Sequence, residues 1–198
     1  MKNIGTDRDW KKVFAARNAK FLKLSPEKQR VAIAQDVIKQ LEAEKYLAGS
    51  TYFQPRVSLD WSKGELAEAI EKPGAACKVC GIGALMVSAC RFVDKLTVRE
   101  ADLNTRYEIH DYLDKYFSSE QLTLIEYYFE ASNKQFADMI EDRVPEVCRE
   151  QFEACAFEKP RDNHPIVNAP TRRSALRRIM ENIVSNKGTF SPNRGKWS

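Results

Sequence analysis

The chain has 198 residues, of which 43% are hydrophobic and 30% charged, a composition typical of a globular protein with one domain of ordinary size. Its first residues, MKNIGTDRDWKK, lack the apolar core of a signal peptide, and the uncharged stretch from Val79 to Cys90 is shorter than the roughly 20 residues that span a bilayer. We therefore expect a cytoplasmic protein outside the membrane, with its five cysteines as reduced thiols.

Charge is distributed unevenly along the chain. Residues 1–100 carry a net charge of +6, residues 101–158 carry −9 and residues 159–198 carry +7, within an overall charge of +4. An acidic middle segment followed by a basic end can pair within the molecule, or it can offer faces of opposite charge to partners.

The first part of the chain predicts helices with one strand-like interruption. Residues 1–24 predict an N-terminal helix that can be peripheral to the domain. Ser25-Pro26 is a strong signal for the start of a second helix, because serine can cap the helix and proline lacks only an N–H that would have no partner there. The strand-like piece is STYFQPRVSL, which Pro55 interrupts.

The second part of the chain is also predicted to be helical. Ser118 and Thr171 are each expected to cap a helix with an apolar face. Between these two helices, residues 136–140 indicate one further helix and Pro145 opens another. The tail, residues 188–198, is expected to be irregular.

The stretch CKVCGIGALMVSACR, residues 77 to 91, contains pieces of several functional motifs. A phosphate-binding loop needs a third glycine, where Met86 stands, and a preceding strand, where we expect Pro73-Gly74 instead. A zinc site needs a second pair of ligands at short spacing, which Cys148 and Cys155 do not provide. A redox pair belongs at a strand–helix junction, which we do not predict here.

A structural interpretation fits this stretch better. Apolar and small residues surround the predicted helix, about residues 77–95, on every side, which indicates a buried central helix. We expect another helix to approach it closely over Cys80, Gly83 and Ala84, and we expect the cysteines to pack as small hydrophobes. The predicted fold is therefore an all-α, single-domain, multi-helix bundle over residues 1–198, with at most one short strand pair.

The remaining candidates for catalysis are histidines and carboxylates. His110 is one helical turn from Asp114, a pair that is more often structural than catalytic. His164 is a second isolated candidate for a metal ligand. Glu126 and Glu130 share a helix face, where two carboxylates can serve hydrolysis, although a solvated acidic face is the usual outcome. From the sequence we assign no catalytic residue, no cofactor and no metal ligand.

The stretch TRRSALRR, residues 171 to 178, is the sharpest charge feature. Its first two arginines occupy the first turn of a helix, where the helix dipole disfavours cations, so we expect them to bind an anion. If the anion belongs to a partner, neutralising the helical arginines leaves stability nearly unchanged; if it belongs to the acidic middle segment, stability falls. The candidate binding residues are Arg172, Arg173, Arg177, Arg178, Arg194, Lys196 and Trp197.

Three stretches together, CKVCGIGALMVSACR, YFSSEQLTLIEYYFE and RRIMENIVSNKGTFSP, resemble an uncharacterised helical protein family of bacteriophages and bacteria. The resemblance covers roughly residues 26–192. None of the three stretches is a catalytic signature, so the resemblance assigns no active-site residue. Phage ancestry would imply a small protein that modulates or inhibits a host protein complex in the host cytoplasm.

The sequence therefore predicts a non-enzymatic protein that binds a macromolecule through charged helix faces and its basic C-terminus. We favour a protein over a nucleic acid as the partner, because nucleic-acid binding usually brings a larger basic excess. The first alternative is a nucleic-acid-binding protein that uses the C-terminal basic helix. The second is an enzyme or metal protein that uses Cys77, Cys80, His110 and acidic residues. The sequence leaves the oligomeric state open.

Overall fold

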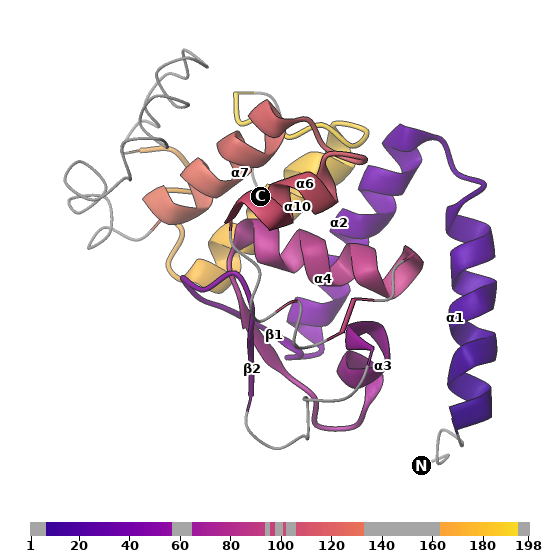
Figure 1. Cartoon of the computed structure of the whole chain (residues 1–198). Helices are drawn as coiled ribbons and strands as arrows, with labels where there is room; N and C mark the ends of the chain where they lie inside the picture. Colours follow the sequence, from indigo (N-terminus) through magenta and orange to yellow (C-terminus); the bar gives the residue numbers. More distant parts are fainter. Residues whose placement is uncertain are drawn as a thin grey trace.

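The computed structural model of the chain describes residues 7–56, 65–93, 96–97, 101, 106–132 and 163–193. Within these ranges it is mostly helical, with a small three-stranded sheet (Figure 1). The helices predicted near residues 136–140 and at Pro145 lie outside the described residues. No helix in the described ranges has both the length and the apolar composition needed to cross a membrane.

Seven helices occur in the described residues, and several begin where capping signals predicted. Ser25 is the N-cap of a helix with proline in its first turn, although its side chain makes no capping hydrogen bond. Ser118 accepts a hydrogen bond from the Gln121 backbone, and Thr171 forms a capping box with Ser174. The helices are α1 (Asp7–Phe21), α2 (Pro26–Glu42), α3 (Leu66–Glu71), α4 (Gly81–Val93), α6 (Arg106–Leu113), α7 (Ser119–Ala131) and α10 (Arg172–Ser185).

The small sheet corrects our prediction of an all-α fold with at most one strand pair. Its middle strand, β3 (Cys77–Val79), pairs in parallel with β1 (Tyr46–Ala48) and antiparallel with β2 (Gln54–Pro55). We had assigned residues 77–79 to the central helix, but they form a strand that buries its first and last residues and exposes the middle one. Pro55 lies on an edge strand, where a missing N–H is tolerated.

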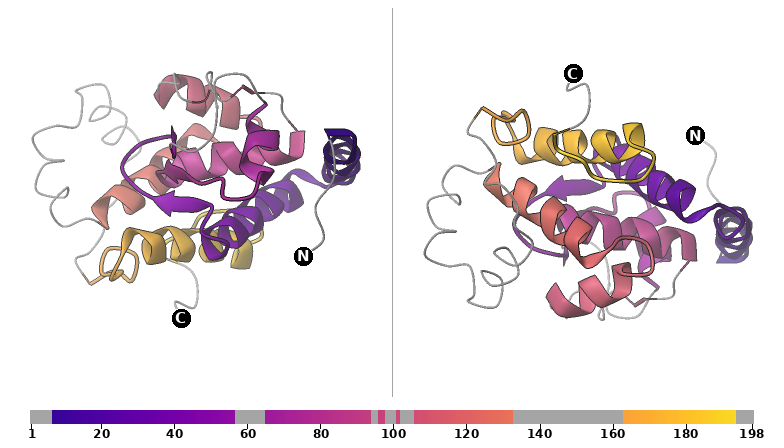
Figure 2. Two further views of the ribbon diagram at one scale, coloured as in Figure 1. Left: turned by 90° about the horizontal axis from the view of Figure 1, so that it is seen from below. Right: turned by 90° about the horizontal axis from the view of Figure 1, so that it is seen from above.

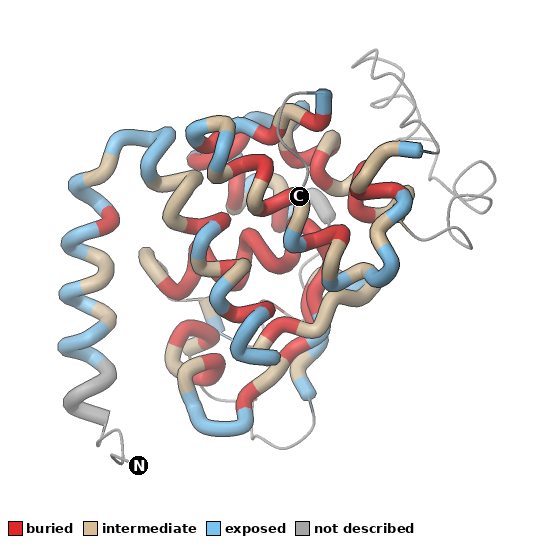
Figure 3. The backbone as a smooth tube through the Cα atoms, turned by 180° about the vertical axis from the view of Figure 1, so that it is seen from behind, coloured by how far each residue is buried: buried red, intermediate tan, exposed pale blue. Residues whose placement is uncertain are grey.

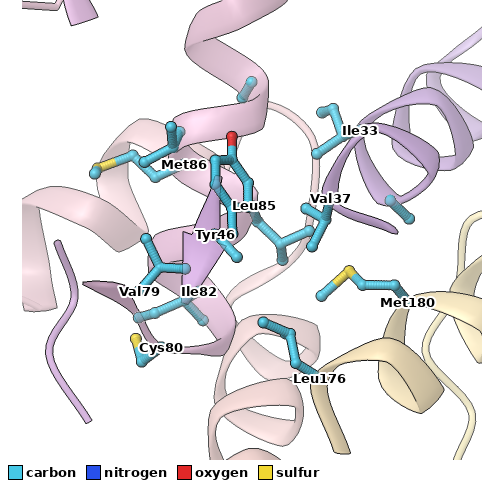
Figure 4. Close-up of a cluster of buried hydrophobic side chains, with 14 of the residues drawn as sticks. Ile33, Val37, Tyr46, Val79, Cys80, Ile82, Leu85, Met86, Leu176 and Met180 are labelled. Carbon is cyan, nitrogen blue, oxygen red and sulfur yellow. The ribbon is translucent and has the colours of Figure 1, made fainter. Parts of the chain in front are cut away.

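Helix α4 is buried from Gly81 to Arg91, as its all-round apolar pattern predicted. Helices α1, α2, α3, α6 and α7 all pack against it. Figure 4 shows Leu85 of α4 pointing toward Val37 of α2, with Met180 of α10 close by. The main hydrophobic core is therefore built on α4, with α2 and α10 running beside each other at its edge (Figure 2).

The glycine at position 83 is required by a close approach, but the approaching segment is a loop and not the helix that we predicted. A Cβ atom at Gly83 would lie 1.6 Å from the backbone oxygen of Tyr52, in the loop between β1 and β2. The same loop accepts a hydrogen bond at Thr51 from the backbone N–H of Cys80, at 2.7 Å. The loop thus runs directly across the start of α4.

Helix α1 lies at the edge of the molecule (Figures 1 and 3). It is attached near its C-terminal end, where the ring of Phe21 stacks on Phe92 with centroids 4.7 Å apart and meets Tyr116 edge-on at 5.9 Å. Asn18 adds a hydrogen bond to the carbonyl of Phe92 at 3.0 Å. The opposite side of the helix is exposed.

The burial of α4 predicts a large effect of truncating Leu85. Leu85→Ala should lower the free energy of unfolding by about 2–5 kcal/mol, because it removes buried methyl groups and leaves a cavity. Leu22→Ala is the matched control: Leu22 is 57% exposed, and its loss should cost less than about 0.5 kcal/mol. Chemical denaturation measures both, and equal losses for the two variants would contradict the assignment of α4 to the core.

Candidate functional site

Cys77 and Cys80 stand at the junction between β3 and α4. This is the strand–helix context of a redox pair, which the sequence did not lead us to expect. Both thiols are buried, however, and burial raises the pKa of each above its ordinary value. The sulfur of Cys80 accepts a weak hydrogen bond from the backbone N–H of Gly83 at 3.5 Å. Thiols that are held protonated are poor nucleophiles, so this pair contributes packing and local hydrogen bonding.

The junction between β3 and α4 also tests whether Gly81 and Gly83 can form a phosphate-binding loop. A strand does precede Gly81 and Gly83, contrary to our prediction. The backbone carbonyl of Tyr52 nevertheless occupies the space over Gly83 that an approaching phosphate would need. Gly81 in turn faces the side chains of Phe129 and Ile125 on α7. Both glycines therefore serve close packing within the protein.

His164 has a structural role in the described residues. Its Nδ1 accepts a hydrogen bond from the backbone N–H of Ile166 at 3.2 Å, so Nε2 carries the proton of the neutral ring and donates to the carbonyl of Pro192 at 3.1 Å. With both ring nitrogens engaged, His164 cannot ligate a metal in this arrangement. In the described ranges, no three His, Cys, Asp or Glu side chains gather closely enough for a metal ion, and Cys148 and Cys155 lie outside those ranges.

His110 of α6 pairs with a residue of another helix and not with Asp114, which is exposed. Its Nε2 lies 3.8 Å from Oε2 of Glu126 on α7. The hydroxyl of Tyr52 donates to the other oxygen of the same carboxylate at 3.1 Å. Three elements thus bring an imidazole, a carboxylate and a phenol together, and the side chains of His110 and Glu126 are largely shielded from solvent.

Glu130, one turn beyond Glu126, is also shielded, so the solvated acidic face that we expected on α7 is wrong. Its carboxylate accepts a hydrogen bond from Arg172 of α10 at 3.0 Å. Burial raises the pKa of Glu130, and the nearby guanidinium offsets this only in part. Arg172 also lies over the ring of Phe129, with its central carbon 5.2 Å from the ring centroid. The unfavourable position of Arg172 at a helix start is therefore compensated within the molecule.

Arg173 and Arg177 lie on another side of α10, toward the C-terminal end of α2. Arg173 donates to the carbonyl of Leu41 at 2.7 Å, with Glu44 3.8 Å away. Arg177 bridges Glu42 at 3.2 Å and Glu181, one turn along its own helix, at 2.7 Å. Both guanidinium groups remain about half exposed. They have carboxylates of the same chain nearby and are also accessible to a partner.

Arg178 points in a third direction and donates to the carbonyl of Pro165. The four arginines of α10 consequently do not share one face. The three further binding candidates, Arg194, Lys196 and Trp197, lie outside the described residues. An external partner for this set therefore remains a prediction.

A second group of charges, which we did not identify from the sequence, surrounds Arg91 at the end of α4. Arg91 is 3% exposed and makes ion pairs with Asp36 of α2 at 2.8 Å and Glu71 of α3 at 2.9 Å. Arg17 of α1 pairs with the same oxygen of Glu71 at 2.9 Å, and Lys45 lies 4.0 Å from the other. This cluster joins α1, α2, α3 and α4, and its burial indicates a structural role.

The exposed side of α1 is a candidate binding surface that our sequence interpretation missed. Lys12 and Lys20 of α1 are exposed, and their spacing of eight residues places them on the same broad side of the helix; Lys23, in the turn that follows, is exposed as well. No acidic residue occurs between Lys11 and Leu24 in the sequence, although α1 also contains Asp7 and Asp9 near its start. We call this surface, with the exposed Ala16 and Ala19 between the lysines, the lysine face.

Comparison of the chain with protein-family models, with curated proteins and with solved structures finds no match. The family resemblance of the sequence is thus not tested by a relative. The functional interpretation depends on the geometry of the chain itself.

The contacts of the α10 arginines predict unequal effects of neutralising them. Arg172→Gln should lower the free energy of unfolding by about 1–3 kcal/mol, since it leaves the shielded carboxylate of Glu130 without its charged donor. Arg177→Gln should cost less than about 1 kcal/mol, because its ion pairs are exposed. Urea denaturation compares them, and equal costs would show that the Arg172–Glu130 pair does not contribute as its geometry suggests.

Glu71 should make stability depend on pH in the acid range. Burial alone would raise its pKa, but Arg91 and Arg17 outweigh burial and lower it. A folded-state pKa below the unfolded-state value gives stabilisation that is complete above the unfolded-state pKa and is lost as pH falls through the folded-state pKa. Glu71→Gln should therefore be less stable at neutral pH and lose less stability on acidification below about pH 5.

Urea denaturation at a series of pH values measures this difference. Glu68→Gln, on the same helix, is the control and should follow the pH profile of the parent chain. Parallel profiles for the parent and Glu71→Gln would contradict the lowered pKa of Glu71.

Proposed function

We propose that this protein acts by binding an acidic macromolecular partner through the lysine face of α1, without catalysing a reaction. The observation that carries the proposal is the set of exposed lysines Lys12, Lys20 and Lys23, on a peripheral helix and the turn after it, in a stretch from Lys11 to Leu24 that contains no acidic residue. Exposed lysines without acidic residues beside them in the sequence attract a surface of opposite charge.

A protein is a better candidate than a nucleic acid for this surface. In the described residues, the large hydrophobic side chains that are exposed are Val13 and Leu22, at 51% and 57%, and both belong to α1 or its end. Exposed apolar side chains beside the lysines can add apolar contacts to charged ones, a combination that protein–protein interfaces usually contain. A phosphate backbone would use the lysines but would gain little from the apolar residues.

The resemblance to a phage family supports a more specific form of this proposal. The partner would be a component of a host protein complex, met in the host cytoplasm, and binding would modulate or inhibit that complex. The nucleic-acid alternative differs in what the lysines contact, and the same experiment separates the two.

Neutralising the lysine face should weaken capture of the partner without unfolding the protein. The variant Lys12→Gln, Lys20→Gln, Lys23→Gln should retain roughly one tenth of the affinity at physiological salt, because each peripheral charge contributes a few tenths to about 1 kcal/mol. The control changes three exposed lysines elsewhere, Lys39→Gln, Lys72→Gln, Lys78→Gln, and removes the same total charge. The measurement is quantitative pull-down from the native cell over a range of salt concentrations.

Nuclease treatment of the lysate supplies the second comparison. Capture that survives nuclease and depends on the lysine face supports a protein partner, whereas capture lost on nuclease treatment supports nucleic acid. Equal capture by the lysine-face variant and the control would contradict the proposal, since the effect would then follow from net charge and not from α1.

A further inference from the structure

The chain that follows α10 is held between α7 and α10 as an extended peptide (Figure 2, right). We call residues 189–193 the strap. They adopt no regular secondary structure, yet burial alternates along them: Phe190 and Pro192 are buried, whereas Thr189 and Asn193 are exposed. This period of two is the pattern of an extended segment lying on a surface. The strap therefore has one side in contact with the protein and one side in solvent.

Two side-chain amides hold the backbone of the strap. Gln121 of α7 donates to the carbonyl of Phe190 at 3.1 Å and accepts from the N–H of the same residue at 2.7 Å. Asn182 of α10 makes the same pair of hydrogen bonds with Ser191: it donates to the carbonyl at 3.0 Å and accepts from the N–H at 2.8 Å. Each amide thus satisfies both backbone groups of one residue, as a neighbouring strand would.

Side-chain contacts are concentrated at two positions. The ring of Phe190 is 1% exposed and meets Tyr128 edge-on, with centroids 5.5 Å apart. Pro192 is buried, and its carbonyl accepts the hydrogen bond from His164. A proline fits the second position because its missing N–H leaves no donor unsatisfied there.

The strap begins at the turn that ends α10. Lys187 and Gly188 have φ of 55° and 94°, and their backbone N–H groups donate to the carbonyls of Val184 and Ile183, as in a helix C-cap. The carbonyl of Gly188 is held by Arg30 of α2 at 2.7 Å.

We propose that the groove between α7 and α10 is a binding site for an extended peptide with an aromatic residue and, two positions later, a proline. The strap occupies this groove as an intramolecular ligand, and a peptide of a partner protein with the same chemistry replaces it. The backbone contacts of Gln121 and Asn182 provide affinity for any extended peptide, whereas the sites of Phe190 and Pro192 provide specificity. This division is that of peptide recognition by strand addition.

The proposal is independent of the lysine face, because it involves neither α1 nor any of its residues. An attached ligand competes at an effective concentration in the millimolar range, so a free peptide binds the parent chain weakly. Weakening the strap should expose the groove. The variant Phe190→Ala removes the aromatic anchor in the full-length chain and leaves the amides of α7 and α10 in place.

The probe is a fluorescein-labelled peptide with the sequence of residues 187–193, Lys-Gly-Thr-Phe-Ser-Pro-Asn, and the measurement is fluorescence anisotropy. Phe190→Ala should bind it at least about tenfold more tightly than the parent chain, since the competing strap is weakened. Adding Gln121→Leu to that variant should remove most of this gain in affinity for the peptide. A control peptide with alanine in place of phenylalanine should not bind.

Circular dichroism establishes that each variant is folded before binding is measured. If Phe190→Ala does not fold, Ser191→Pro serves in its place. It removes the backbone N–H that donates a hydrogen bond to Asn182, and it keeps the buried ring of Phe190. Failure of a folded strap variant to bind the probe more tightly than the parent chain overturns the proposal. So does equal binding of the alanine-containing peptide, which would show that the aromatic site does not select its ligand.

Discussion

The burial of a single guanidinium, that of Arg91, constrains how four helices of this protein pack. Helix α4 is otherwise apolar and hidden from solvent, so the arginine in its last turn enters the interior with it. An ion removed from water loses several kcal/mol of hydration, which only close partners can offset. Asp36 from α2 and Glu71 from α3 supply these partners, and Arg17 brings α1 onto the same carboxylate. The positions of α1, α2 and α3 around the end of α4 follow from this requirement.

At the opposite end of α4, packing is constrained by the size of a side chain and not by its charge. The loop that carries Tyr52 passes so close to the helix that only glycine fits at position 83. Because that loop connects β1 and β2, the approach also places these strands beside β3, which leads directly into α4. The stretch that looked like a functional motif in the sequence is therefore where strand, loop and helix meet with little space between them.

The parts of the fold that the sequence predicted are those set by local interactions. The helix starts at Ser118 and Thr171 depend on hydrogen bonds within three residues, so they can be recognised without knowledge of the tertiary structure. The strand Cys77–Val79 could not be separated from the helix that follows, because a short apolar run has no distinguishing period. Its identity comes from pairing with Tyr46–Ala48, about thirty residues earlier in the chain.

Long-range pairing also explains what the sequence could and could not say about the candidate site. The arginines of α10 were identifiable as a cluster, but the carboxylate that accepts from Arg172 is 42 residues away in the sequence. Likewise, the backbone of Phe190 is hydrogen-bonded by the side chain of Gln121, 69 residues away. His110 pairs across helices and not with its neighbour Asp114 for the same reason. The lysine face was visible in the sequence as the acid-free stretch from Lys11 to Leu24, and it was overlooked because the arginines of α10 are more closely spaced.

The different hydration and hydrogen-bonding geometry of arginine and lysine favour α1 over α10 as the surface for an external anion. Guanidinium is weakly hydrated and offers several donors in a fixed plane, so arginine suits contacts inside a protein, whereas the strongly hydrated ammonium of lysine stays in water. The chain follows this rule: Arg17, Arg91 and Arg172 turn inward to carboxylates, while the lysines of α1 remain exposed. Lys45 is an exception, and burial lowers its pKa accordingly. Charges already neutralised by their own chain attract a partner weakly, so an approaching acidic surface gains most by meeting the exposed lysines of the stretch from Lys11 to Leu24, which contains no acidic residue.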